Sequence, residues 1–237
     1  MPCKSQETIT ERAFLSALQI TDSFFPVGGF NHSFGLETYV QEGIIRSGDD
    51  LRNFLEVYLS DIMKYTDFLA LSLAHGFAAR GELESVIRID NILTATKSSH
   101  ETKMASIKMG KTLLNLSIKL WNSSLLEEFL RRIKEGSASG NHAIVYGALT
   151  SLLKIPLFYS LISFIYNTTA NMLSASIKLM PLGQGEAQMI LYSLQETILD
   201  IVGEVLNMSE EELGSFAPAY DIRCMSHERL YSRLFMS

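Results

Sequence analysis

The chain has 237 residues, of which 47% are hydrophobic, and its formal net charge is −6. This size and apolar content allow one substantial core, so we predict a single domain over residues 1–237. Because the charge balance is acidic and the lysines and arginines form no dense run, we expect no nucleic acid partner.

The two cysteines, Cys3 and Cys224, lie at opposite ends of the chain and have no CxxC spacing. This arrangement argues against a disulfide framework and favours a reducing compartment. The stretch MPCKSQETITER at residues 1–12 lacks the apolar segment of a secretory signal. We therefore expect a cytoplasmic protein.

Residues 21–43, TDSFFPVGGFNHSFGLETYVQEG, bring a proline, two adjacent glycines, a histidine and several aromatic residues into one short segment. Pro26 with Gly28 and Gly29 is typical of a shaped loop, and Asp22 can cap a helix or turn. Taken alone, these residues predict a structural loop.

A helical period dominates the chain from residue 51 onward. Ser47 and Asp49 are candidate caps, and apolar residues then follow at steps of three and four: Leu51, Phe54, Leu55, Tyr58, Leu59, Ile62 and Met63. Similar stripes occur within 83–87, 104–121 and 125–133, and GSASG at 136–140 is a break after which Asn141 can cap the next helix. Because no segment alternates as a strand would, we predict an all-α bundle of roughly eight to ten helices.

The segment between Pro156 and Pro181 is apolar on nearly every face of its first half, which predicts a central, buried helix. Polar residues at 167–169 and 171 interrupt it well short of the roughly 20 apolar residues of a membrane span, so we expect no membrane partner. An amphipathic helix over 190–205 and a capping box at Ser209 and Glu212 follow. After Pro218 the sequence predicts an irregular tail.

Local patterns that could carry chemistry are weak. Gly110, Lys111 and Thr112 match the end of a phosphate-binding loop, but Ala105 stands where the first glycine is needed, and the segment has a helical period. A Ser-His-Asp set drawn from residues 22, 32 and 33 would need neighbours in one turn to converge on one atom. Neither pattern identifies an active site.

Metal ligation has equally little support in the spacing. None of the five histidines has another at the i, i+4 distance. Cys224, Met225 and His227 place a thiol, a thioether and an imidazole close together, but two or three ligands do not close a site. We predict no metal ligand in this chain.

Three segments resemble the urease accessory protein UreF family. DSFFPVGGFNHSFGLET at 22–38 is similar to its N-terminal signature, and KLMPLGQ at 178–184 is similar to its Pro-Leu-Gly-Gln break between long helices. PAYDIRCMSHERLYSRLFMS at 218–237 is similar to its C-terminal signature. Each segment alone is a weak signal, but their joint order is specific.

The resemblance implies a non-enzymatic urease maturation factor with an all-α fold. It implies a scaffold that binds UreD (also called UreH) and the GTPase UreG and assists nickel insertion into apo-urease, and that forms a homodimer. A contact with the GTPase could order its switch segments, but nothing in the sequence selects an arginine for that role. We expect no bound cofactor, because nickel would be handled by the assembled complex.

The resemblance also assigns partner contacts to residues of all three segments. In the loop, Phe25 and Phe30 are expected to be exposed or half-buried anchors. The tail over 218–237 is expected to become ordered on contact with UreD, since it has few neighbours of its own. The assigned residues are Asp22, Phe25, Pro26, Gly28, Gly29, Phe30, His32, Gly35, Glu37, Pro181, Gly183, Gln184, Asp221, Arg223, His227, Arg233 and Phe235.

The alternative is an all-α metal-dependent hydrolase or ligand-binding helical protein whose acidic and histidine side chains converge only in space. Its acidic candidates are Glu37, Asp61, Asp67, Asp90 and Glu101. The simpler interpretation is that these acids cap helices, pair with lysines or face solvent.

Overall fold

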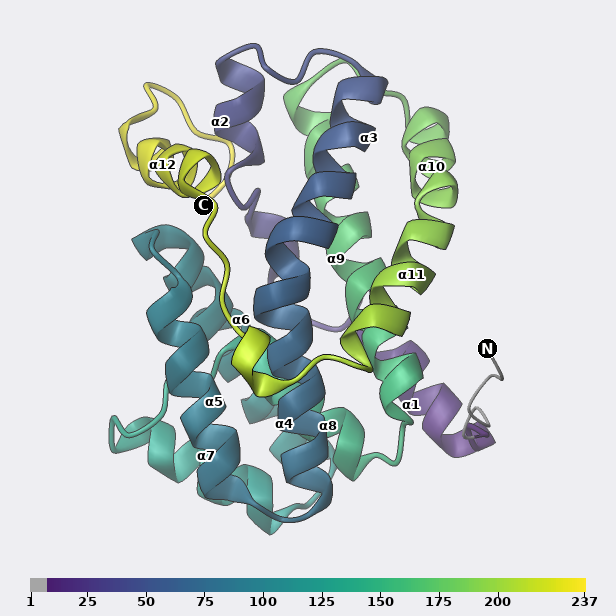
Figure 1. Ribbon diagram of the computed structural model, residues 1–237, viewed down its shortest axis with the longest axis vertical. Helices are drawn as coiled ribbons and strands as arrows, with labels where there is room; N and C mark the ends of the chain where they lie inside the picture. Colours follow the sequence, from purple (N-terminus) through teal and green to yellow (C-terminus); the bar gives the residue numbers. More distant parts are fainter. Residues whose placement is uncertain (1–7) are drawn as a thin grey trace.

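The computed structural model describes residues 8–237, and this part of the chain is built from helices without a strand (Figure 1). The prediction of an all-α fold is confirmed. Cys3 lies outside the described residues. The α-helices are α1 (Glu11–Thr21), α2 (Leu36–Gln41), α3 (Gly48–Val57), α4 (Leu69–Ala79), α5 (Leu83–Thr96), α6 (His100–Leu120), α7 (Ser124–Lys134), α8 (His142–Leu152), α9 (Leu157–Leu179), α10 (Gln184–Ser193), α11 (Gln195–Val205) and α12 (Pro218–Ser226).

The described residues contain more α-helices than the expected eight to ten. The estimate used an average helix length, whereas several helices here are shorter than average. The amphipathic stretch predicted over 190–205 is divided at Leu194 between α10 and α11. Short 3-10 turns lie at Gly29–Asn31, Glu210–Glu212 and His227–Arg229.

Two helical elements begin at capping residues that the sequence predicted, Ser47 and Ser209. Ser47 Oγ accepts a hydrogen bond from the Asp50 main-chain N at 3.1 Å, and Asp50 Oδ2 accepts from the Ser47 N at 3.0 Å. This capping box begins α3. A second capping box joins Ser209 and Glu212, but it begins a 3-10 turn rather than an α-helix.

One continuous helical rod runs from α3 to α4 through a π-helical segment, Tyr58–Phe68. A π-helix bonds residue i to i+5, so its turns are wider than those of an α-helix, and such segments are frequent at functional sites. Within this segment Thr66 and Asp67 are both buried.

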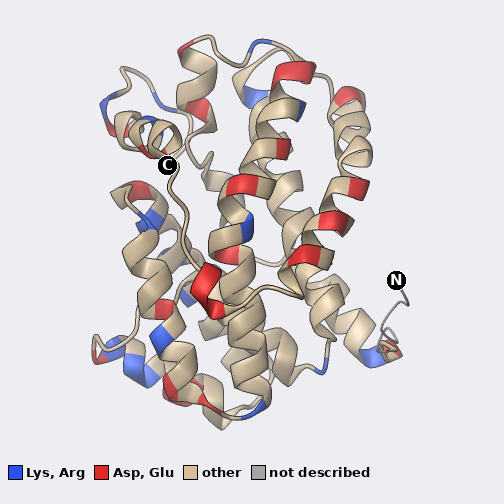
Figure 2. Ribbon diagram, in the orientation of Figure 1, with Lys and Arg blue, Asp and Glu red and all other residues tan. Residues whose placement is uncertain are grey.

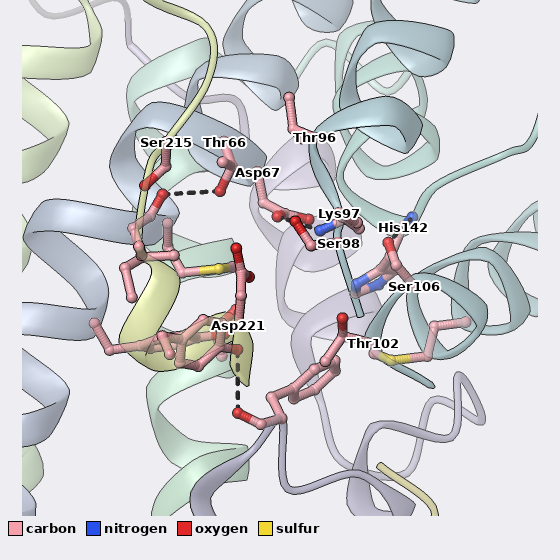
Figure 3. A pocket seen from close by; sticks show the side chains of 18 of the residues that line it. Thr66, Asp67, Thr96, Lys97, Ser98, Thr102, Ser106, His142, Ser215 and Asp221 are labelled. Carbon is pink, nitrogen blue, oxygen red and sulfur yellow. Dashed lines mark hydrogen bonds and ion pairs between the residues drawn. The ribbon is translucent and has the colours of Figure 1, made fainter. Parts of the chain in front are cut away.

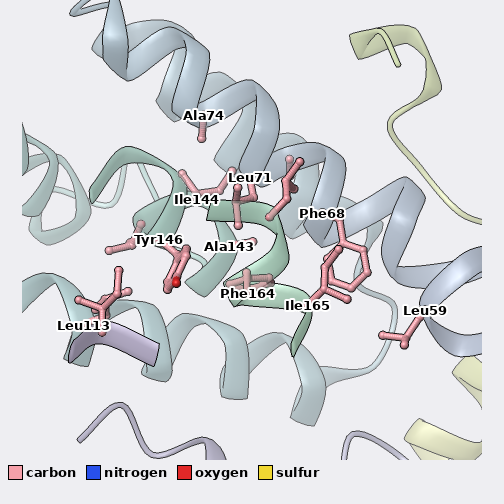
Figure 4. Packing of buried hydrophobic residues seen from close by; sticks show 14 of the residues in the cluster. Leu59, Phe68, Leu71, Ala74, Leu113, Ala143, Ile144, Tyr146, Phe164 and Ile165 are labelled. Carbon is pink, nitrogen blue, oxygen red and sulfur yellow. The ribbon is translucent and has the colours of Figure 1, made fainter. Parts of the chain in front are cut away.

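The core lies around α8, in which every residue from 143 to 151 is buried. Gly147 makes the contact with α4 possible, because a Cβ atom there would lie 2.5 Å from the Leu71 carbonyl oxygen. Figure 4 shows α8 residues packed among Leu71, Phe68 and side chains of α9, including Phe164.

The helix predicted between the two prolines is α9, and one of its sides enters the core. Phe164 and Ile165 are buried there, whereas Tyr166 on the other side is 42% exposed. Both α8 and α9 therefore contribute to the core, and α8 is the more enclosed of the two. Within residues 8–237, no helix combines the length and the apolar character that crossing a bilayer requires.

The chain after residue 213 crosses the bundle and ends beside α2 (Figure 1). It begins α12 at Pro218, so the segment expected to be an irregular tail contains a helix of nine residues. Proline suits the first turn of a helix because its missing N–H is unpaired there in any case. Figure 2 shows basic and acidic residues interspersed over much of the visible face, with only acidic ones on α10 and α11.

Candidate functional site

The N-terminal signature segment and the last residues of the chain meet through main-chain hydrogen bonds. The amides of Ser33 and Phe34 donate to the Ser237 carbonyl oxygen at 2.5 and 3.1 Å, and Met236 N donates to Asn31 O at 2.8 Å. The Ser33 hydroxyl also donates to the Ser237 carbonyl, at 2.8 Å. We refer to residues 227–237 as the tail segment.

Glu37, on α2, holds the tail segment from the inside. Its side chain is 1% exposed, and its two oxygens accept hydrogen bonds from the amides of Leu234 at 2.8 Å and Phe235 at 3.2 Å. Gln41, one turn later on α2, donates to the Ser232 carbonyl at 3.0 Å. A buried carboxylate requires such donors, because burial without them costs several kcal/mol.

His227, the first residue of the tail segment, contacts both α2 and α6. Its side chain is 1% exposed, with Nε2 3.0 Å from Glu37 Oε2 and Nδ1 2.5 Å from Glu101 Oε2. The other oxygen of Glu101 accepts from Arg233 Nη1 at 2.8 Å. The two carboxylates and the two basic side chains thus form one connected network, which we call the tail clasp: Glu37, Glu101, His227 and Arg233.

Close packing of α12 on α2 depends on Gly35. Its φ is +82°, and a Cβ atom there would lie 2.6 Å from Cys224 Sγ. Burial raises the pKa of the Cys224 thiol to about 12, so the thiolate needed for metal binding is disfavoured. Arg223, also on α12, pairs with Glu42 at 2.9 Å and lies over the Tyr39 ring.

His32 also contacts the tail segment. Its Nδ1 lies 2.9 Å from Ser237 Oγ, and burial, followed by the Lys108 cation, lowers its pKa. The structure therefore brings His32, Glu37, His227, Arg233 and Phe235 of the predicted set together.

The Pro-Val-Gly-Gly-Phe loop differs from expectation at its aromatic residues. Phe25, expected to be an exposed or half-buried anchor, is 7% exposed and belongs to the core, whereas the preceding Phe24 is 93% exposed. Both residues lie in a turn in which Asp22 Oδ1 accepts a hydrogen bond from the Phe24 amide at 2.6 Å and the Asp22 carbonyl accepts one from the Phe25 amide at 2.9 Å. Gly28 has a φ of +87°, a backbone conformation that glycine adopts more readily than other residues. The Phe30 side chain lies outside the described part of the structure.

The third motif, Pro181 to Gln184, lies between α9 and α10, and its Pro181, Gly183 and Gln184 are exposed. Shortly before it, at the end of α9, Lys178 Nζ lies 5.6 Å from the centre of the Phe235 ring of the tail segment.

A cavity of about 90 Å³, whose wall is mostly apolar, lies between the π-helical segment, α6, α8, α9 and α12 (Figure 3). Asp67 and Lys97 form an ion pair of 2.6 Å on its wall. Burial lowers the pKa of His142, another wall residue, to about 4, so its imidazole is neutral at pH 7. Asp221 and Tyr220 of α12 complete the wall, so the cavity is closed by the part of the chain that precedes the tail segment.

Most of the chain is similar to proteins of one family. The UreF family model matches residues 45–195. A urease accessory protein UreF from Bacillus sp. (strain TB-90) is 34% identical over 223 residues, which are 94% of this chain and 98% of that protein. The UreF proteins of Actinobacillus pleuropneumoniae serotype 5b (36%, 93% and 97%) and Haemophilus influenzae strain KW20 (34%, 93% and 94%) are similar over comparable lengths. The chain belongs to the UreF family.

The matches to UreF proteins extend beyond the range of the family model. The family model matches from residue 45 to residue 195, so three of the four tail-clasp residues, Glu37, His227 and Arg233, lie outside the matched range. The pairwise similarity nevertheless covers 94% of the chain. Membership in this family of urease accessory proteins places the chain in urease maturation.

The acids of the alternative enzyme hypothesis have structural partners in this UreF protein. Glu37 and Glu101 belong to the tail clasp, and Asp67 pairs with Lys97. Asp90, which is fully buried, accepts from the main-chain amides of residues 139, 140 and 141 at 2.6, 2.8 and 2.8 Å, and so fixes the GSASG loop. Asp61 accepts from the Ser60 hydroxyl at 3.1 Å.

Among residues 8–237, no three histidine, cysteine, aspartate or glutamate side chains are grouped as metal ligands. In the tail clasp, the two carboxylates lie on opposite ring nitrogens of His227, so they do not face one common point. The geometry of the described residues supports a structural role for these acids.

Sequence reasoning missed two residues of this region as contacts, Glu101 and Tyr220. Glu101 was considered only as a catalytic acid, whereas it binds His227 and Arg233. Tyr220 donates from its hydroxyl to the Phe34 carbonyl at 3.1 Å. The Pro-x-x-Asp spacing contains Tyr220 as one of its variable positions, and no spacing rule would have selected it.

Proposed function

We propose that this UreF protein is a non-enzymatic cytoplasmic scaffold, or chaperone, that binds UreD (UreH) and the GTPase UreG and assists GTP-dependent nickel insertion into apo-urease. The observation that carries the proposal is the ordered tail segment, which presents apolar side chains to solvent. Tyr231 is fully exposed, and Leu234 and Met236 are 69% and 55% exposed. Family membership supplies the urease context.

Residues 218–237 were expected to have few neighbours and to become ordered on contact with UreD, but residues 234–237 are hydrogen-bonded to Glu37 and to residues 31–34 of the same chain. We therefore propose the tail segment as a preorganised contact surface for UreD. Its main chain is fixed on α2 and its Phe235 ring is buried, while neighbouring side chains point outward. Fixing a segment before binding reduces the conformational entropy lost on association. Exposed tyrosine, leucine and methionine together suit the apolar centre of an interface.

A homodimer is the second element of the proposal, and α1 supports it. Phe14, Leu15 and Leu18 on α1 are 51%, 66% and 52% exposed. Leu15, Leu18 and Phe24 line one side of a surface groove. Leu120 of α6 forms its opposite side and is 46% exposed. A contiguous apolar surface of this kind is costly in water unless a partner covers it.

Nickel delivery is assigned to the assembled complex, and we propose that this chain holds neither nickel nor a cofactor permanently. The buried acids Glu37, Asp67 and Asp90, together with His227 and Glu101, are engaged in ion pairs or main-chain contacts. The role of the chain toward UreG would be to favour one state of the GTPase through differential affinity.

Co-expression with UreD and UreG, followed by size-exclusion chromatography and metal analysis, tests the proposal. We expect a complex that co-elutes and little metal on this chain alone. The double variant Tyr231→Ser and Leu234→Ser should abolish co-elution with UreD, because both side chains are exposed and contribute little to the fold. Met189→Ser is the matched control, since Met189 is 67% exposed on α10.

Two results would contradict the proposal. One is a lone chain that carries stoichiometric metal and binds neither partner, which would favour the metal-dependent hydrolase. The other is full UreD binding by the double variant, which would show that UreD does not bind the exposed side chains of the tail segment. For the homodimer, Leu15→Asp should produce a monomer by light scattering, and an unchanged mass would exclude α1 as the interface.

A further inference from the structure

The cavity of about 90 Å³ that α12 closes has a wall that is apolar over most of its area. Aromatic rings come from Phe34, Phe164 and Tyr220. Met63 and Met109 add thioether side chains. Because a cavity of about 150 Å³ holds one benzene molecule, this cavity suits a smaller molecule with an apolar part.

The hydrogen-bond donors of the wall are largely engaged within the chain. Hydroxyl and amide groups of six wall residues donate to oxygens of the protein at 2.6 to 3.1 Å: Thr66, Thr102, Asn167, Thr168, Asn171 and Tyr220. Lys97 donates to Asp67 Oδ2 at 2.6 Å. A ligand that only accepts hydrogen bonds would therefore find few donors here.

The acceptors of the wall, by contrast, remain available. Asp67 receives Lys97 on Oδ2, which leaves Oδ1 for a second donor. Within residues 8–237, no hydrogen bond reaches the Asp221 carboxylate or the ring nitrogens of His142. Since burial lowers the pKa of His142 to about 4, one of these nitrogens carries a lone pair at pH 7. The wall thus fits a ligand that donates hydrogen bonds.

The charges of the wall select the sign of the ligand. Asp67 and Lys97 cancel as an ion pair, so Asp221 leaves one negative charge in excess. This charge would repel an anion. A bare metal ion would need several ligands, and the described residues offer no group of three acidic, histidine or cysteine side chains. An organic cation is attracted by both the carboxylate and the faces of the aromatic rings.

We propose that the cavity binds a small organic ammonium ion, with its N–H groups directed to Asp67, His142 and Asp221 and its carbon atoms among the aromatic rings. Figure 3 shows these three side chains on different sides of the cavity, and they belong to the π-helical segment, α8 and α12. The bound ion therefore joins α12 to the body of the bundle. Because the tail segment follows α12, occupancy stabilises the position from which the tail segment runs to α2.

Ethylammonium, ethanol and acetate are probes of similar size that differ in charge. Each is titrated into the nitrogen-labelled full chain at constant ionic strength, and the amide NMR shifts locate the site. Ethylammonium should shift the amides of residues 67, 142 and 221 with a dissociation constant of about 1 to 50 mM, as three non-hydrogen atoms allow. Ethanol and acetate should bind at least about tenfold more weakly, because the first lacks the charge and the second is repelled.

Asp221→Asn removes the excess charge of the wall while keeping the shape of the side chain. Its affinity for ethylammonium should fall about tenfold or more. Asp200→Asn is the matched control, since Asp200 is exposed on α11, and it should bind as the parent chain does. If Asp221→Asn disturbs α12, the three probes on the parent chain still decide the question.

Three results would overturn the proposal. They are the absence of saturable shifts at the cavity amides with ethylammonium, equal binding of ethanol, and unchanged affinity in Asp221→Asn. Since the titrations use neither UreD nor UreG, their outcome is independent of the proposed function, and failure of either proposal leaves the other in place.

Discussion

Glu37 Oε2 and His227 Nε2 are 3.0 Å apart, although 190 residues separate them along the chain. This contact joins two of the three segments that resemble the UreF signatures. Because Glu37 and His227 are both buried, these signature residues stabilise the fold, whatever part the signatures have in binding a partner. Substitutions at these positions will therefore change stability before they reveal partner contacts.

Replacing Glu37 by alanine should lower the free energy of unfolding by about 3 to 5 kcal/mol, because it leaves His227 and two main-chain amides without their buried acceptor. Urea denaturation followed by circular dichroism measures this change. Glu42→Ala, which removes the half-exposed partner of Arg223, should cost less than about 1 kcal/mol. Equal losses in the two variants would show that Glu37 is not a central support.

Gly147→Ala should destabilise the protein by about 1 to 3 kcal/mol, because the new methyl group would be forced against the Leu71 carbonyl in the α4–α8 contact. Gly203→Ala is the matched control, since Gly203 lies in α11 with nothing within 4 Å of the added Cβ. There alanine should stabilise the helix by up to about 1 kcal/mol. Thermal unfolding of both variants should show opposite shifts, and shifts of the same sign would contradict the packing argument.

Gly35→Ala should loosen α12 and expose the Cys224 thiol. Both the positive φ and the contact with Cys224 oppose a side chain at this position. Site-resolved thiol labelling followed by mass spectrometry should therefore show faster modification of Cys224. Gly81→Ala shares the positive φ, at +72°, but meets nothing within 4 Å, so it should leave the labelling rate unchanged. Slow labelling in both variants would argue that α12 does not depend on this contact.

Acid should destabilise the fold through His142. Burial lowers its folded pKa to about 4, below the value of about 6.5 for an unfolded histidine. Above that unfolded value the residue is neutral in both states and costs nothing. As the pH falls from about 6.5 to about 4, only the unfolded state gains the proton, so stability should fall by no more than about 3 kcal/mol.

The check for His142 is urea denaturation at several pH values in this window. His142→Gln should flatten the part of the pH dependence that this residue causes, whereas His100→Gln should not, since His100 is exposed. If both variants retain the full slope of the parent chain, other groups cause the acid sensitivity.

Local rules predicted the helices well and the tertiary contacts poorly. The capping box at Ser47 and the stripe from Leu51 placed α3 correctly, because capping and periodicity are properties of neighbouring residues. The interruption by a π-helical segment at Tyr58 was not predicted, since the apolar spacing there still fits an ordinary helix. The enclosure of α8 also escaped prediction, because it depends on which helices surround it.

The residues of the candidate site were likewise predicted in part, and their tertiary contacts were not. The resemblance selected Glu37, His227 and Arg233, and the structure brings them together. It did not reveal that Glu101 completes their network, because no sequence rule links positions 101 and 227. Phe25, expected to be exposed or half-buried, is buried, and no local pattern distinguishes it from the exposed Phe24 beside it.

The separation of 190 residues between Glu37 and its histidine also has a consequence for synthesis on the ribosome. At ordinary elongation rates, roughly 10 to 40 s pass between the two residues. During that interval α2 lacks the segment that covers its carboxylate, so this face of the nascent chain remains hydrated and open. The tail segment can therefore dock on α2 only after the helices between them have been synthesised.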